Sequence, residues 1–137
     1  MANKIEVYFS IAARDFDPSE ITNALGVEPT SSHATGEPLK YVAKAKYSKW
    51  CLSSGVKSAE DADMYELSRD LIDILKDKIE VIISLKNKFD AKIVLQTSIQ
   101  MDESEEPDNV SYPSVGLESD EILFLSKIGA SLDVDIN

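Results

Sequence analysis

A short helix with a fixed start and a fixed end follows the first extended segment of the chain. Asp17 can cap its N-terminus, and Pro18 suits the first helical position, where its missing N–H needs no partner. Glu20 stands three residues after Asp17, as in a capping box. Gly26 can adopt the left-handed conformation that ends a helix, so only two turns fit between these signals. The apolar side chains that share one face of this helix are Ile21, Ala24 and Leu25.

Residues 4–12 precede this helix and alternate between apolar and polar side chains. A period of two residues is typical of a strand that is buried on one face and open to water on the other. The sequence therefore predicts a half-buried strand that leads into a short helix. The apolar members of this strand are Ile5, Val7, Phe9 and Ile11.

The segment after the helix is polar. Residues 30–36 are rich in serine and threonine and include a glycine, so we expect a loop there. Residues 39–43 and 46–53 predict a hairpin of two strands with a tight connection. Trp50 carries the largest apolar side chain of the second strand, and we expect it to face the core.

The rest of the chain alternates helical and extended patterns. Residues 60–89 follow the spacing of an amphipathic helix, with a break near Asp77, after which residues 79–85 predict a second helix rather than a strand. An acidic loop is expected over residues 102–112. The other predicted elements are a strand over residues 92–101, a helix over residues 117–128 that Ser119 caps and Gly129 ends, and a final alternating strand over residues 132–136.

These elements predict one α+β domain that spans residues 1–137, with a single, mostly antiparallel sheet of about five strands and helices packed on one face. Residues 16–27 and 117–130 each follow a strand, place an acidic residue before isoleucine and close on glycine. This similarity indicates an internal strand-helix repeat. A chain of 137 residues buries roughly two-thirds of its unfolded surface, so it needs neither a disulfide nor a metal to fold.

Negative charge is concentrated toward the C-terminal end. The formal net charge is −11. Residues 102–137 hold one lysine and ten acidic residues, a net charge of −9. A field of this sign disfavours nucleic acid and anionic membranes, and it speeds the encounter with a cationic partner. The alternative is that the acidity serves only solubility.

The sequence predicts a cytoplasmic protein. Cys51 is the single cysteine and cannot form an internal disulfide, and the N-terminus lacks the basic flank and apolar core of a signal peptide. Charges interrupt the apolar stretches before they reach the length that a bilayer requires. We therefore expect no transmembrane helix.

No catalytic signature is present in the sequence. A catalytic nucleophile needs a base, and His33 is the only imidazole, in a loop where we expect it to be solvated. We expect Cys51 to be an inert packed thiol. Neither a Gly-x-Ser-x-Gly motif nor a phosphate-binding glycine loop occurs. One cysteine and one histidine are too few for a structural zinc site, and the acidic loop lacks the spacing of a calcium-binding loop. The sequence predicts no enzyme activity, no metal and no cofactor.

The order of the motifs resembles a known bacterial family. The motifs are FDPSEITNALGVEPT, a polar loop with a glycine, the strand SKWCLSS, an acidic amphipathic helix and the closing segment IGASLDVDI. As an ordered set they cover nearly the whole chain and resemble the domain of unknown function DUF4279. That family often carries a basic residue after Glu-Pro-Thr, where this chain has Ser31, Ser32 and His33. The resemblance implies a small α+β domain without an established reaction or catalytic residues and, for some members, a setting among toxin-immunity systems.

The charge and the resemblance together favour a non-catalytic binding protein. We expect an immunity protein that neutralises a basic toxin domain, for example a contact-dependent inhibition nuclease, through an acidic surface. The expected partner is thus a cationic protein, and neither nucleic acid nor a membrane. The predicted partner-binding residues are Asp102, Glu103, Glu105, Glu106, Asp108, Glu118, Asp120 and Glu121.

Two alternatives remain open. One is a small-molecule sensor or enzyme whose pocket lies between the polar loop and the tryptophan strand. The other is a homodimer in which an exposed sheet edge pairs with its twin. The predicted residues of the alternative pocket are Thr30, Ser32, His33 and Trp50.

Overall fold

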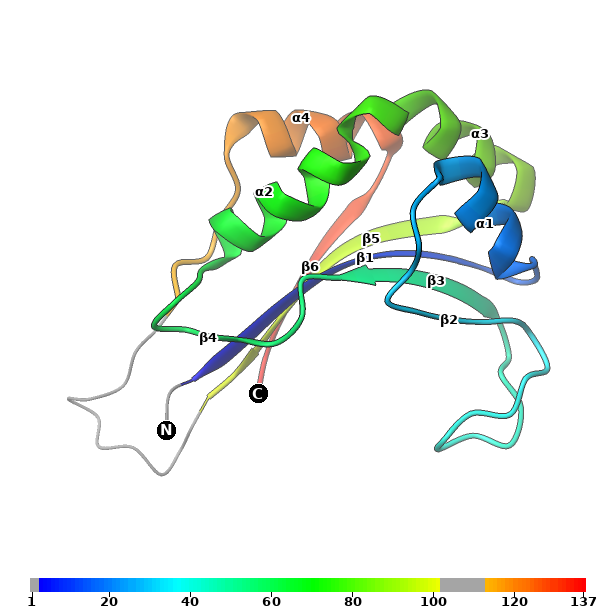
Figure 1. Ribbon diagram of the computed structural model, residues 1–137, viewed down its shortest axis with the longest axis horizontal. Helices are drawn as coiled ribbons and strands as arrows, with labels where there is room; N and C mark the ends of the chain where they lie inside the picture. The colour runs from blue at the N-terminus through cyan, green and yellow to red at the C-terminus, as the bar shows by residue number, and fades with distance from the viewer. Residues whose placement is uncertain (1–2, 102–112) are drawn as a thin grey trace.

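A layer of helices covers one face of a β-sheet in the computed structural model, which describes residues 3–101 and 113–137 (Figure 1). The predicted α+β class, with helices on one face of the sheet, is confirmed. The elements in chain order are β1 (Lys4–Ala13), α1 (Pro18–Leu25), β2 (Ser31–His33), β3 (Ser48–Ser53), β4 (Lys57–Ser58), α2 (Met64–Leu75), the short 3₁₀ helix η1 (Lys76–Lys78), α3 (Ile79–Phe89), β5 (Lys92–Gln100), α4 (Ser119–Ile128) and β6 (Ser131–Ile136).

The sheet has six strands within the described residues. Five of them follow the order β2-β3-β1-β5-β6, and β4 pairs with the first residues of β1. β1 pairs antiparallel with β3 on one side and with β5 on the other, whereas β5 and β6 run parallel. The predicted sheet of about five mostly antiparallel strands is therefore a mixed sheet of six.

The alternation in β1 determines where the core lies. Its apolar side chains point toward the helices and are fully buried, while Glu6 and Tyr8 lie on the opposite face, which we call the open face. Burial of each such side chain contributes roughly 1.5–3 kcal/mol. The helices close this core with Leu71, Leu75, Ile82, Leu125 and Ile128.

The first helix begins and ends where the sequence predicts, but Asp17 and Glu20 do not form the capping box. An Oδ1 atom of Asp17 accepts the N–H of Ser19 at 3.0 Å, and Gly26 ends α1 with a φ of 69°. The Glu20 side chain accepts a hydrogen bond from Lys88 of α3 at 3.0 Å.

Trp50 is fully buried beneath α1, and its indole N–H donates to the hydroxyl of Thr22 at 3.1 Å. The prediction that Trp50 faces the core is confirmed.

The predicted strand over residues 39–43 is wrong. Residues 34–47 instead form an arm, which we call the β2–β3 arm, that projects on the side of the sheet away from the helices (Figure 1). Two backbone hydrogen bonds close its base, from Gly36 to Ala45 at 2.8 Å and from Ala45 to Glu37 at 2.7 Å. On the edge away from β1, β3 pairs with β2, which lies inside the predicted polar loop.

A buried hydroxyl holds the base of the arm in place. Ser48, the first residue of β3, is fully buried. Its Oγ accepts the N–H of Phe16 at 3.0 Å and the N–H of Thr35 at 2.9 Å. These bonds hold the base of the arm against the start of β3.

The remaining predicted elements differ mainly at their ends. The first long helix starts at Met64, because Asp63 caps it by accepting the N–H of Glu66 at 2.9 Å. The second helix predicted from residue 79 is confirmed as α3. Ser119 does not cap α4, because Glu118 occupies the N-cap position and its carbonyl accepts the N–H of Ile122 at 3.1 Å.

Among the residues that the structure describes, no helix is both long enough and apolar enough to cross a membrane.

Replacement of Thr22 by valine tests the contact between α1 and Trp50. The variant leaves the buried indole N–H without an acceptor, so we expect the free energy of unfolding to fall by about 1–3 kcal/mol in urea denaturation. Thr22→Ser keeps the hydroxyl and should lose much less. Equal losses for the two variants would contradict this role of the hydrogen bond.

Candidate functional site

A groove runs between α2, η1 and α4 on the outer side of the helical layer. Its volume is about 540 Å³. Apolar side chains from α2, α4 and the first residue of α3 line it, and charged side chains surround them. The apolar residues are Ile72, Ile79, Leu123 and Phe124, and the charged ones are Arg69, Asp73, Lys76, Glu118, Asp120, Glu121 and Lys127.

The structure brings three of the predicted partner-binding residues to this groove. Glu118, Asp120 and Glu121 lie at the start of α4 and line the groove. The five predicted residues of the acidic loop, Asp102, Glu103, Glu105, Glu106 and Asp108, lie outside the described residues. The described part of the prediction is thus a cluster at one end of α4.

Glu121 differs from its two neighbours because it is already paired inside the protein. It is only 4% exposed, and its Oε1 lies 3.4 Å from Nε of Arg69 on α2. A carboxylate that is removed from water is stabilised by such a charged donor. Glu121 therefore joins α4 to α2, whereas Glu118 and Asp120 remain exposed to solvent.

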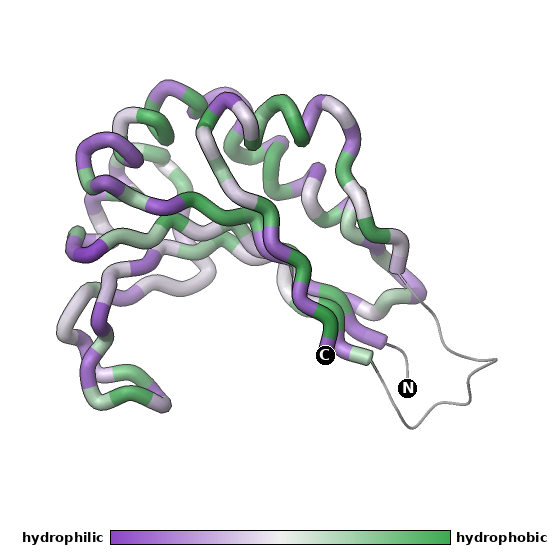
Figure 2. The backbone as a smooth tube through the Cα atoms, turned by 180° about the vertical axis from the view of Figure 1, so that it is seen from behind, coloured by the Kyte–Doolittle hydropathy of each residue, from purple (hydrophilic) through white to green (hydrophobic). Residues whose placement is uncertain are grey.

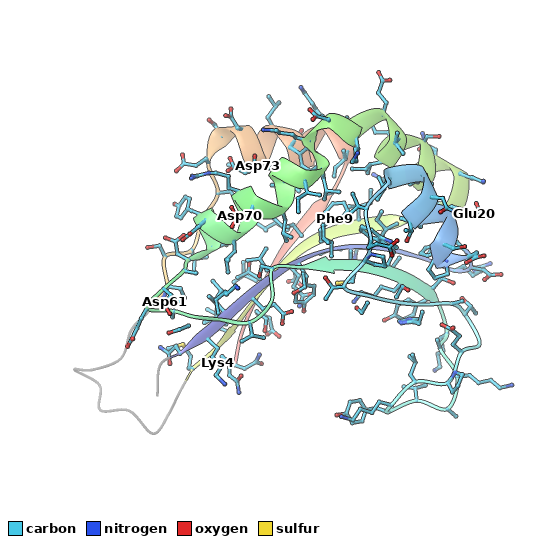
Figure 3. All side chains as sticks on the ribbon, in the orientation of Figure 1. Lys4, Phe9, Glu20, Asp61, Asp70 and Asp73 are labelled. Carbon is cyan, nitrogen blue, oxygen red and sulfur yellow. The ribbon has the colours of Figure 1, made fainter. Side chains whose placement is uncertain are left out.

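Sequence reasoning did not assign a binding role to the acidic residues of α2. Residues 58–75 hold six acidic residues and one arginine, so the charge pattern could have indicated this surface. Figure 3 shows Asp61, Asp70 and Asp73 following one another along the helix and the turn before it. We call the exposed acidic side chains of the turn before α2, of α2 itself and of the start of α4 the acidic helical surface. They are Glu60, Asp61, Glu66, Asp70, Asp73, Glu118 and Asp120.

A backbone contact holds the two acidic segments near each other. The N–H of Met64, the first residue of α2, donates to the carbonyl of Ser114 at 3.1 Å. A second, smaller hollow of about 220 Å³ lies at this junction and is lined by residues 59–63, Glu66, Pro113 and Ser114. The chain that leads into α4 therefore passes beside the acidic start of α2.

The residues of the alternative pocket do not share one surface. Trp50 has no exposed area, and its only donor is already bonded to Thr22. Thr30 accepts the N–H of Ser53 at 2.9 Å. The ring of His33 packs edge-on against Tyr47, with the ring centroids 5.5 Å apart. β2 places Ser32 beside Trp50 in register, but the indole lies in the core and offers no face to a ligand.

Cys51 lies on the open face in the middle of β3 and is 8% exposed. Burial raises the pKa of its thiol, while nearby Lys49 and a hydrogen bond with Ser31 act in the opposite direction. A thiol with a raised pKa forms little thiolate near neutral pH and is a poor nucleophile. Across the described ranges, no three side chains of His, Cys, Asp or Glu come together in a way that could hold a metal ion.

Comparison with known proteins gives one match. A family model described as a domain of unknown function, DUF4279, matches residues 3–137. No curated protein and no solved structure matches the chain.

Removal of the Arg69 side-chain charge tests the link between α2 and α4. In Arg69→Met the buried carboxylate of Glu121 loses its charged donor, so we expect the free energy of unfolding to fall by about 1–3 kcal/mol. The matched control is Lys76→Met, which removes an exposed pair with Asp73 and should change stability by less than about 1 kcal/mol. Equal losses of unfolding free energy for the two variants in urea denaturation would show that the Arg69–Glu121 pair stabilises the fold no more than the exposed pair does.

The burial of Cys51 predicts slow alkylation. Because burial raises the pKa of the Cys51 thiol, iodoacetamide should modify the folded protein more slowly than free cysteine near neutral pH. The rate of modification should increase at a higher pH for Cys51 than for free cysteine. Protein unfolded in urea should react like free cysteine, which serves as the control. Rapid alkylation of the folded protein near neutral pH would contradict the prediction.

Proposed function

This chain belongs to the DUF4279 family, a family of unknown function, and we propose that it is a non-catalytic protein that binds a cationic protein partner on its acidic helical surface. The partner in this proposal is a basic toxin domain, and the protein is its immunity protein in the cytoplasm. The toxin-immunity part of the proposal draws on the genomic setting that the family resemblance implies.

The observation that carries this proposal is the concentration of exposed carboxylates on one layer of the fold. The acidic helical surface holds seven of them. The cations that line the groove are Arg69, which is paired with Glu121, Lys76, which lies 3.4 Å from Asp73, and the exposed Lys127. Much of the negative potential therefore stays uncompensated at the surface. Such a surface accelerates association with a cationic protein and penalises anionic competitors.

The groove adds a place for an anchoring side chain. Its apolar residues, including Ile72 and Leu123, can contact the aliphatic stem of an arginine or lysine from the partner. Asp120 and Glu118 at its edge can then accept hydrogen bonds from the cationic head. Anchors that enter a pocket and are surrounded by weaker contacts commonly dominate the affinity of a protein interface.

The non-catalytic part of the proposal is supported by the state of the two residues with nucleophilic or basic chemistry. His33 packs against Tyr47, and Cys51 is buried on β3. The two residues lie on neighbouring strands, with Cys51 beside Ser31 and His33 beside Lys49 in the pairing register. His33 is therefore not the strand partner of the thiol.

Charge reversal on the acidic helical surface tests the proposed function. Tagged wild-type protein is used as bait in lysate of its source at low and at high salt, and the retained proteins are identified by mass spectrometry. We expect a basic protein that is released as the salt concentration rises. Purified partner should then bind the triple variant Asp70→Lys, Asp73→Lys, Asp120→Lys roughly 100-fold more weakly at low salt, since each contact between unit charges is worth about 1 kcal/mol in water.

A matched control has the same change in net charge at other exposed sites, with lysine in place of Asp15, Glu28 and Glu80. Its affinity for the partner should stay close to that of the wild type. If the partner is a toxin, the wild type and this control should suppress its activity and the triple variant should not. Equal affinities for the two triple variants would overturn the proposal.

A further inference from the structure

β6 ends the sheet, and within the described residues no strand pairs with its outer edge. All six of its residues are exposed. The N–H of Asn137 donates to Ile99 at 2.9 Å, and its carbonyl accepts from Met101 at 3.0 Å. Because successive residues of a strand turn their backbone groups to opposite edges, the residues with backbone groups directed away from β5 are Leu132, Val134 and Ile136.

The helix side of β6 is apolar and uncovered. The register places Leu132, Val134 and Ile136 beside Leu95, Thr97 and Ile99 of β5. Yet these three β6 side chains are 49%, 37% and 62% exposed, whereas their β5 neighbours are buried. The hydropathy colours of the strand that leads to the C-terminus alternate accordingly (Figure 2).

The helical layer also has an exposed apolar side chain that does not face the groove. Ile122 of α4 is 55% exposed. The groove with α2 is lined by Asp120, Leu123 and Lys127, so helical geometry turns Ile122 to the opposite side of α4, away from α2.

The open face of β6 is acidic. Asp133 and Asp135 lie beside Gln96 and Ser98 in the register. Tyr8 on β1 is the next neighbour beyond Gln96. Burial, then Glu6, and further Asp135 and Asp133 raise the pKa of the Tyr8 phenol, which agrees with the placement of these carboxylates on one face.

We propose that β6 is a docking edge that accepts one strand from a cationic partner protein. The strand carries lysine or arginine at alternate positions, over Asp133 and Asp135, and apolar residues between them, beside Leu132, Val134 and Ile136. Backbone hydrogen bonds give such strand addition its affinity, and the alternating side chains give its specificity. This inference rests on the proposed function only for the sign of the partner's charge, because it uses a different surface.

A second copy of the chain fits this edge less well. The antiparallel register that pairs most of two β6 strands about a two-fold axis places Val134 opposite its twin. It also places Asp133 of each copy directly opposite Asp135 of the other. Like charges in directly opposite positions destabilise a strand pair. The two aspartates therefore act against self-pairing and favour a strand with positive charges.

A defined peptide tests this edge directly. The probe is an eight-residue peptide that alternates lysine and valine, with blocked ends, and it is titrated into the isotope-labelled full chain under NMR observation. We expect the amide protons of Leu132, Val134 and Ile136 to shift and to exchange more slowly with solvent. The amide of Asn137, already bonded to Ile99, is the internal reference. Two control peptides should bind much more weakly. One has glutamate in place of lysine, and the other has the same lysines and valines grouped instead of alternating.

Two variants separate strand addition from general charge attraction. Val134→Pro removes an outward N–H while the bonds to β5 remain, so the folded variant should lose the peptide, and Val134→Thr should keep it. The double variant Asp133→Lys, Asp135→Lys should weaken binding of the lysine peptide roughly tenfold and favour the glutamate peptide.

Three results would overturn the proposal. The first is that the control peptide, in which the lysines and the valines are grouped instead of alternating, binds as tightly as the probe. The second is that folded Val134→Pro binds the probe as tightly as the wild type. The third is that the probe shifts only amide signals of α2 and α4. A dimer of the free protein that Val134→Pro dissolves would make the second copy the occupant, and would equally overturn it. The triple variant of the acidic helical surface should still bind the peptide at β6, so failure here is distinguishable from failure of the proposed function.

Discussion

The two-sided pairing of β1 is the constraint on which the rest of the structure depends. β3 and β5 both pair along this strand, and its apolar side chains all point to the face that the helices cover. A shift of one residue in either register would turn a full set of side chains from the core to water. The positions of α2 over β1 and of β6 beyond β5 follow from this arrangement, and with them the positions of the groove and of the docking edge.

The acidic helical surface and the basic β2–β3 arm lie on different sides of the sheet. Carboxylates gather on the outer side of the helical layer, where Glu121 and Arg69 tie α4 to α2 and leave Glu118 and Asp120 free for solvent or a partner. On the other side of the sheet, the β2–β3 arm carries Lys40, Lys44 and Lys46. A cationic partner therefore meets attraction on one layer and repulsion near the arm, which restricts the orientations in which it can approach.

Local signals predicted much of this fold, and long-range contacts account for the rest. Asp17, Pro18 and Gly26 act on their own neighbours, so the limits of α1 could be read from the sequence. The strand predicted at residues 39–43 does not form because β2, rather than this segment, pairs with β3, and no local pattern reveals which segment a strand will pair with. The acidic residues at the start of α4 could be predicted as a cluster, but the pairing of Glu121 with Arg69, 52 residues away, could not. The internal strand-helix repeat stays a prediction.

The pairing of β1 with β5 also has a kinetic consequence. Lys4 lies opposite Gln100, so the two central strands come from distant parts of the chain, and the segment between them contains α1, α2 and α3. Such a contact requires closure of a long loop, whose entropy is lost before the pairing rewards it. Folds dominated by contacts of this kind fold slowly compared with helical bundles of similar size. β6 pairs with β5, so it becomes part of the complete sheet only once this central pair has formed.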